Sequence, residues 1–161
     1  MGFKFCLLYT FPSPWDGLLP RYSSSSCIKK TVFQLFDLLM QLAEQHQKGL
    51  LPGYTHLQVA MPSSFGMWFS AYAESLIDDV HFLNTAYTLA DQNPLGSAAG
   101  FGSSFPIDRE FTTEQLNFST LKVNAVAAQM NRGKVEKTTA IALSMVGSTL
   151  AKFAMDICLY M

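Results

Sequence analysis

The chain has 161 residues, which is enough for one domain of ordinary size with its own core. Only 14% of the residues are charged, against about 25% in a typical soluble domain. The net charge is −1 and the basic residues are scattered, so neither a nucleic acid nor a membrane is expected as a partner. Such a shortage of charged residues is expected of a chain whose surface is covered by partner subunits. It is also expected of a fragment that lacks its more polar parts.

The three cysteines are Cys6, Cys27 and Cys158. They form no metal-ligand spacing, and one of them stays unpaired in any disulfide scheme, which favours a reducing cytoplasm. We therefore expect no metal and a cytoplasmic protein.

Residues 1–30 differ from the rest of the chain, and we predict that they are a non-family or disordered N-terminal segment. The run Ser23–Ser26 is typical of a flexible linker. We place the helical domain at residues 31–161. Its first helix should begin with Thr31 as N-cap and stop near Gly49, because apolar residues recur at spacings of three and four. These residues are Val32, Leu35, Phe36, Leu39, Leu42 and Ala43.

A turn between two helices is predicted from Leu50 to Pro62. Pro52 and Gly53 favour a fixed corner, which would present Thr55, His56 and Gln58. A lone histidine beside a turn is more often a satisfied polar residue than a functional one.

A second helix should follow, capped by Ser63 or Ser64 and running to about Ala90. We predict that Asp78, Asp79 and His81 lie on a solvent-exposed face of this helix. The apolar residues are expected to pack along one broad side. They are Phe65, Trp68, Phe69, Tyr72, Leu76, Val80, Leu83 and Tyr87.

Residues 91–106 are too rich in glycine and proline for a regular helix, and they lack the Gly-Lys-Ser/Thr ending of a phosphate loop. A short helix should begin at Asp108. From about residue 123 the chain is expected to be helical to its end, with an interruption near Gly133. The uncharged run 138–151 is shorter than the roughly 20 residues of a membrane span, so we predict a buried bundle helix there.

Three blocks in order resemble the fumarase and aspartase superfamily, and most closely its argininosuccinate lyase family. The first runs from Pro52 to Pro62 and contains Tyr54, Thr55, His56, Leu57 and Gln58. The second is Asn93–Gly100, and the third joins Ile107–Glu110 to Leu116–Phe118. The resemblance implies an all-α, long antiparallel helix bundle, here incomplete, from an oligomer that is a homotetramer in its full-length form.

The resemblance also implies a reaction: cleavage of argininosuccinate to arginine and fumarate by β-elimination, with no cofactor. His56 would be the catalytic residue that transfers a proton, which suits its unperturbed pKa of about 6.5. Thr55 would bind a substrate carboxylate, Gln58 would support the substrate site, and Arg132 would bind the dicarboxylate with its planar fork.

Two parts of the family pattern are not found in this sequence. One is an upstream Arg-Asn block, and the other is a mobile serine loop, expected shortly after residue 161, that is thought to supply the base. Since each active site of the family combines three subunits, we expect the chain to be inactive alone. Two alternatives stay open: a non-catalytic helical assembly protein derived from the same family, as in lens crystallins, or another superfamily lyase such as adenylosuccinate lyase.

Overall fold

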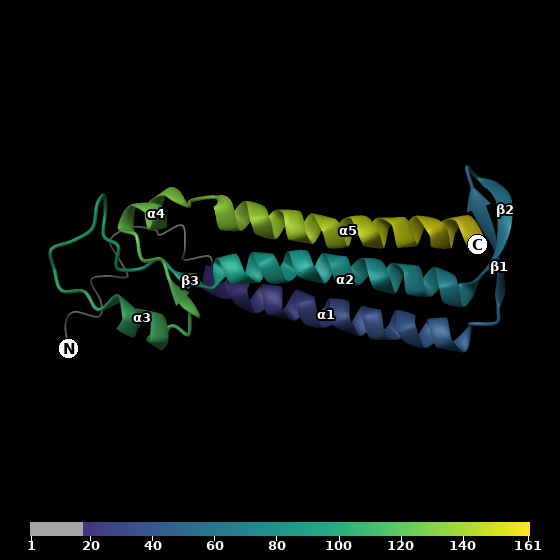
Figure 1. Cartoon of the computed structure of the whole chain (residues 1–161), viewed down its shortest axis with the longest axis horizontal. Coiled ribbons are helices and arrows are strands. Elements are labelled where there is room, and N and C mark those ends of the chain that lie inside the picture. The colour runs from purple at the N-terminus through teal and green to yellow at the C-terminus, as the bar shows by residue number, and fades with distance from the viewer. Residues whose placement is uncertain (1–17) are drawn as a thin grey trace. The chain divides into compact units, whose positions relative to one another are not determined.

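The computed structural model describes the backbone of residues 18–161 and the side chains of residues 27–161. Figure 1 shows that the described chain is mainly helical, which confirms the all-α prediction. The chain divides into two compact units. The helical unit contains residues 26–83 and 141–161, and the loop unit contains residues 84–140 and, of the described N-terminal residues, 18–25. The elements are α1 (Leu18–Gln45), β1 (Leu50–Thr55), β2 (Gln58–Ser64), α2 (Phe65–Ala90), β3 (Gln92–Asn93), α3 (Arg109–Gln115), β4 (Thr120–Leu121), α4 (Ala125–Met130) and α5 (Lys134–Tyr160).

The first helix begins earlier than predicted. α1 starts at Leu18 rather than near Thr31, and Ser23–Ser26 lies inside it, so the prediction of a flexible linker there was wrong. Serine is only a moderately poor helix former, and a long helix on its C-terminal side overrides so weak a preference. The rest of the predicted N-terminal segment, residues 1–17, lies outside the described residues.

The core of the helical unit lies along one stripe of each helix. Its buried apolar side chains are Val32, Leu39 and Ala43 from α1, Ala73, Leu76 and Leu83 from α2, and Ala142 and Val146 from α5. At one end α1 and α2 approach so closely that a Cβ atom on Gly66 would lie 2.9 Å from both the Ala43 carbonyl oxygen and the Gln47 Cα. Only glycine fits at that contact.

The predicted limits of α2 are confirmed. The Ser64 hydroxyl oxygen accepts a hydrogen bond from the Met67 amide over 3.2 Å, as an N-cap does, and the helix ends at Ala90. The prediction of a solvated face was wrong at Asp79. This side chain is only 3% exposed, and its Oδ2 has no hydrogen-bond partner in the described part of the chain, whereas Asp78 is exposed.

α5 begins after an interruption at Gly133, as predicted, where the backbone has a φ of +81°. The prediction of a buried helix was wrong, because only a narrow stripe of small and medium side chains, including Ala142, Val146 and Thr149, is buried. Close helix packing selects those residues, while the large apolar ones face outward. The exposed residues are Ile141, Leu143, Met145, Leu150, Met155, Ile157 and Leu159. Of the described helices, α5 alone is long and apolar enough to cross a membrane by length and composition.

The loop unit is organised by buried polar contacts. β3 and β4 pair in parallel, Gln92 with Thr120 and Asn93 with Leu121. The Asn93 side chain is fully buried, donates to the Thr113 hydroxyl over 2.8 Å and accepts from the Leu95 amide over 2.9 Å. These bonds compensate the burial of an amide that would otherwise be costly.

Two side chains hold the glycine-rich segment of the loop unit. The Arg109 guanidinium donates to the carbonyl oxygens of Leu95, Lys122 and Val123, at 3.0, 2.6 and 2.9 Å. The Gln129 amide group brackets Gly100: its Oε1 accepts from the Gly100 amide, and its Nε2 donates to the Gly100 carbonyl. The segment is therefore irregular, as predicted, but it is held by side-chain hydrogen bonds.

The short helix α3 begins as predicted. The Asp108 carboxylate accepts from the Phe111 amide over 2.8 Å, which is N-cap geometry, and Glu110 lies in the first turn. Both carboxylates thus lie where the helix dipole favours negative charge.

Candidate functional site

The predicted turn at residues 50–62 is a β-hairpin rather than a corner between helices. β1 and β2 pair antiparallel, with Pro52 opposite Pro62 and Thr55 opposite Gln58, and the register shifts between Gly53 and Tyr54. In a two-stranded sheet both strands are edges, so a proline is accommodated where its missing N–H would point away from the partner strand. The two prolines are therefore tolerated within the strands of the hairpin.

His56 and Leu57 form the two-residue loop of this hairpin. Their φ angles are +52° and +64°, the left-handed values that a type I′ turn needs at both central positions. Such turns favour Asn-Gly, and a non-glycine residue held there costs about 1–3 kcal/mol. The strained backbone points to a conformation that the surrounding structure must enforce.

The hairpin brings three of the four predicted site residues together. Thr55 and Gln58 form the last cross-strand pair, and His56 lies at the apex between them. All three side chains are exposed. The arrangement gives a hydroxyl donor, an imidazole and an amide on one open surface, ready to contact another surface or a ligand.

Arg132, the fourth predicted residue, belongs to the loop unit. It lies between α4 and α5, directly after Asn131, which ends α4, and before Gly133. Its side chain is exposed, whereas Arg109 is half-buried and donates three hydrogen bonds to backbone carbonyls. An exposed guanidinium keeps its donors available for a carboxylate.

The root of the hairpin is held by α5 through a group that sequence reasoning missed. The Tyr160 hydroxyl donates to the Pro52 carbonyl over 3.2 Å, and its ring centroid lies 5.6 Å from that of Tyr54. Burial, with smaller contributions from Asp156 and Tyr54, raises the pKa of Tyr160. Tyr160 and Pro52 are 108 residues apart, and no local pattern signals such a contact.

A carboxylate joins the same helices beside this contact. Asp156 Oδ2 accepts from Trp68 Nε1 over 3.0 Å and from the Tyr72 hydroxyl over 2.5 Å. Burial, and then the hydrogen bond to Asp156, raises the pKa of Tyr72. Around these groups Trp68, Tyr72 and Phe153 form an aromatic cluster, with ring centroids 4.9–6.0 Å apart.

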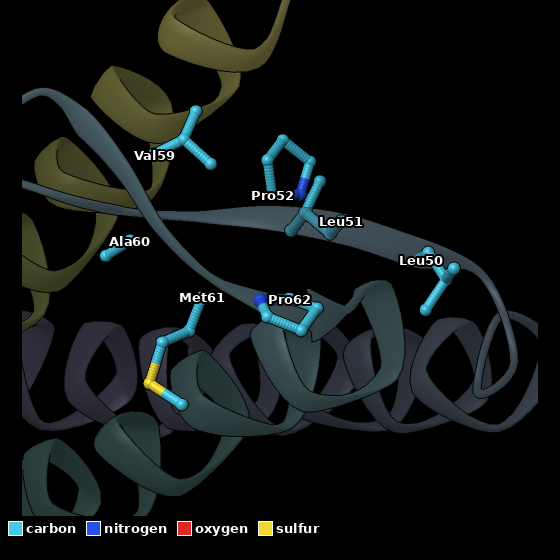
Figure 2. A pocket seen from close by; sticks show the side chains of 7 residues that line it. All are labelled: Leu50, Leu51, Pro52, Val59, Ala60, Met61 and Pro62. Atoms are coloured by element: carbon cyan, nitrogen blue, oxygen red, sulfur yellow. The ribbon is translucent and has the colours of Figure 1, made fainter.

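The two best-formed hollows in the described part of the chain are not lined by His56. The first, of about 360 Å³, lies against the hairpin, and Figure 2 shows only apolar side chains around it. They are Leu50, Leu51, Pro52, Val59, Ala60, Met61 and Pro62. The second, of about 190 Å³, lies in the loop unit beside Arg109, which donates three hydrogen bonds to backbone carbonyls. Neither hollow offers free acid or base groups.

A family model described as "Lyase" matches residues 20–161. The chain belongs to this lyase family. The match begins at residue 20, within α1, ahead of the start at Thr31 that the resemblance suggested.

Argininosuccinate lyases are similar to this chain in sequence. The enzyme of Bacteroides thetaiotaomicron is 53% identical over 133 residues, which is 83% of this chain and 30% of that protein. The enzyme of Parabacteroides distasonis is 56% identical over 126 residues, or 78% of this chain and 28% of that protein. The chain thus spans about 30% of the length of the curated relatives it matches.

Solved lyase structures share the fold. EDDS lyase in complex with formate matches with a TM-score of 0.84 at 22% identity, over 89% of this chain and 29% of that one. A structure described as fumarate lyase:delta crystallin from Brucella melitensis, bound to cobalt, matches with a TM-score of 0.77 at 20% identity, over 89% and 33%. The helix bundle of the fumarase and aspartase type, in part, is therefore the fold of this chain.

Proposed function

We propose that this chain is a segment of an argininosuccinate lyase, a carbon-nitrogen lyase of arginine biosynthesis. The observation that carries the proposal is the exposed hairpin apex, with Thr55, His56 and Gln58, in a chain 53% identical to an argininosuccinate lyase over most of its length. In the reaction a base removes a proton from the carbon beside a carboxylate. The carbon-nitrogen bond then breaks, the double bond of fumarate forms, and the guanidinium nitrogen leaves with a proton as part of arginine.

The residues of the apex suit the proton transfers. His56 would give a proton to the leaving nitrogen or activate another acid or base, because an imidazole can both donate and accept a proton. Thr55 would donate its hydroxyl hydrogen to a substrate carboxylate, and Gln58 would support that contact. Arg132 would pair with the dicarboxylate through its fork of N–H donors. No step of this elimination requires a cofactor or a metal.

An open apex cannot by itself exclude water from the reacting atoms, so other chains would complete the site. The exposed apolar side chains of α5 offer the surface for such assembly, and we propose a cytoplasmic homotetramer. The family match covers all of α5, which supports a bundle helix rather than a membrane span. The mixed, low charge of the chain gives no basis for a nucleic-acid partner.

Complementation tests this function. The chain is mixed with a full-length argininosuccinate lyase whose Thr-His block is disabled, and fumarate formation is followed by absorbance. We expect each component to be inactive and the mixture to be active. Replacement His56→Asn in this chain should abolish the restored activity, while the control His46→Asn, at an exposed position directly after α1, should leave it unchanged. If the unaltered mixture forms no fumarate although mixed oligomers are verified by mass, the proposal is contradicted.

The exposed apolar faces favour a second candidate, a non-catalytic protein whose function is to assemble. His56 would then be inherited without a role. Mixed oligomers without any fumarate formation are the result expected of that candidate. Another lyase of the same superfamily, such as an adenylosuccinate lyase, is distinguished by the substrate that the active mixture cleaves.

A further inference from the structure

The hairpin that carries His56 needs support from outside itself. A single two-stranded hairpin is marginally stable in water. Here both central residues of the loop, His56 and Leu57, adopt left-handed angles that favour glycine or asparagine. Most side chains of the two strands are exposed, and Leu51 is the buried exception. The conformation must therefore be enforced near the root of the strands.

We propose that Tyr160 is a positioning residue, which locks the root of the hairpin onto α5 and so fixes the direction in which His56 points. The role in catalysis rests on the function proposed above. Tyr160 contacts both sides of the register shift between Gly53 and Tyr54, because its hydroxyl binds the Pro52 carbonyl and its ring packs on Tyr54. A β-bulge changes the direction of a strand. A residue that contacts both sides of the bulge therefore determines the direction of the strand after the bulge.

Tyr160 is itself held firmly. Its ring lies edge-on to Trp68, with centroids 5.5 Å apart, and Trp68 is fixed by its hydrogen bond to Asp156. Asp156 and Tyr160 are four residues apart on α5 and therefore share one face of that helix. Trp68 on α2 thus contacts Tyr160 on α5, and Tyr160 in turn contacts Tyr54, which lies two residues before His56.

The structural part of the test measures amide hydrogen exchange at Thr55, His56 and Gln58 in the chain itself. Tyr160→Phe removes the hydrogen bond and keeps the ring, and we expect exchange about 2–10-fold faster. Tyr160→Ala removes the ring as well, and a further acceleration of about 10-fold is expected. The matched control is Lys152→Ala, an exposed position on the same helix, which should not change these rates. Unchanged exchange in both tyrosine variants would overturn the proposal.

The functional part uses the complementation mixture described above. Tyr160→Ala should lower kcat about 10–100-fold with KM changed less than about twofold, because a shift of the proton-transfer group affects the chemical step more than binding. Tyr160→Phe should recover most of the lost kcat. Equal thermal melting of the phenylalanine variant and the unaltered chain excludes a global folding effect.

The two proposals fail in different ways. If the unaltered mixture is inactive, the proposed function fails, while faster hairpin exchange in the variants still supports the role of Tyr160 in holding the hairpin. If the mixture is active and Tyr160→Ala leaves kcat unchanged, the positioning role is overturned and the proposed function stands.

Discussion

The Tyr72 hydroxyl donates a hydrogen bond to the Asp156 carboxylate over 2.5 Å, and this contact joins α2 to α5. Hydrogen bonds to charged acceptors are shorter and stronger than neutral ones. Because the carboxylate also accepts from Trp68, one acidic side chain organises an otherwise aromatic contact between the two helices. The bond lies next to the residues that hold the hairpin, so its stability bears directly on the candidate site.

Replacement Tyr72→Phe should lower the free energy of unfolding by about 1.5–3 kcal/mol at neutral pH, the usual contribution of a hydrogen bond to a charged group. Urea unfolding followed by tryptophan fluorescence measures the change. The control Tyr54→Phe removes a hydroxyl from an exposed ring and should change stability by less than about 0.5 kcal/mol. Equal effects of the two substitutions would show that the Tyr72 contact contributes nothing specific.

The same bond predicts a pH dependence. The pKa of Tyr72 is raised in the folded chain, so folding favours the protonated phenol. The stability it contributes is fully present below the unfolded pKa of about 10 and is lost as the pH rises towards the folded value. The difference in unfolding free energy between the unaltered chain and Tyr72→Phe should therefore be constant from pH 7 to 9 and shrink above about pH 10. A difference that grows with pH would contradict this assignment.

A substitution in the turn of the hairpin is expected to increase stability rather than lower it. Leu57 has a φ of +64° and is 79% exposed, so glycine relieves the backbone without removing buried contacts. Leu57→Gly should stabilise the hairpin by about 0.5–1 kcal/mol, the left-handed penalty less the entropy cost of glycine. The control Leu57→Ala keeps the penalty and should give no gain. Slower amide exchange at Gln58 in the glycine variant, but not in the alanine variant, is the expected result.

Local signals in the sequence identified the starts of α2, α3 and α5, but not the start of α1 at Leu18. Ser64 and Asp108 cap their helices because short polar side chains bind free amides wherever they precede a helix, and Gly133 breaks the chain where a left-handed angle is needed. The hairpin was missed because Pro52 and Gly53 were interpreted as a fixed corner between two helices, although a proline is tolerated in an edge strand.

Contacts between distant residues left no such signal. Helical spacing predicts which residues share a face, but not whether another element covers that face, so the large apolar side chains of α5 were wrongly assigned to the core. The clustering of Thr55, His56 and Gln58 followed from their proximity in sequence. The contacts of Tyr160 with the hairpin did not, because they depend on how α5 packs.

Arg109 should be essential for the stability of the loop unit. Its three hydrogen bonds reach the carbonyls of Leu95, Lys122 and Val123, and a lysine ammonium cannot reproduce this planar fork. Arg109→Lys should lower the free energy of unfolding by about 2–4 kcal/mol, because it leaves partly buried carbonyls without donors. The matched control Arg132→Lys, at an exposed position, should leave stability within about 0.5 kcal/mol. Similar thermal melting of both variants would contradict the role given to Arg109.

Gln129 should control the order of the glycine-rich segment without affecting global stability. Its side chain accepts from the Gly100 amide over 3.1 Å and donates to the carbonyls of Ala98 and Gly100 over 2.6 and 2.9 Å. Ala98 holds a left-handed φ of +57°, so the segment should relax once these bonds are removed. In Gln129→Ala, amide exchange at Gly100 should accelerate about 10-fold or more, while the free energy of unfolding falls by less than about 1 kcal/mol. The control Gln115→Ala, at the exposed end of α3, should change neither quantity. Exchange at Gly100 that is equally slow in both variants would show that the segment is ordered by its backbone alone.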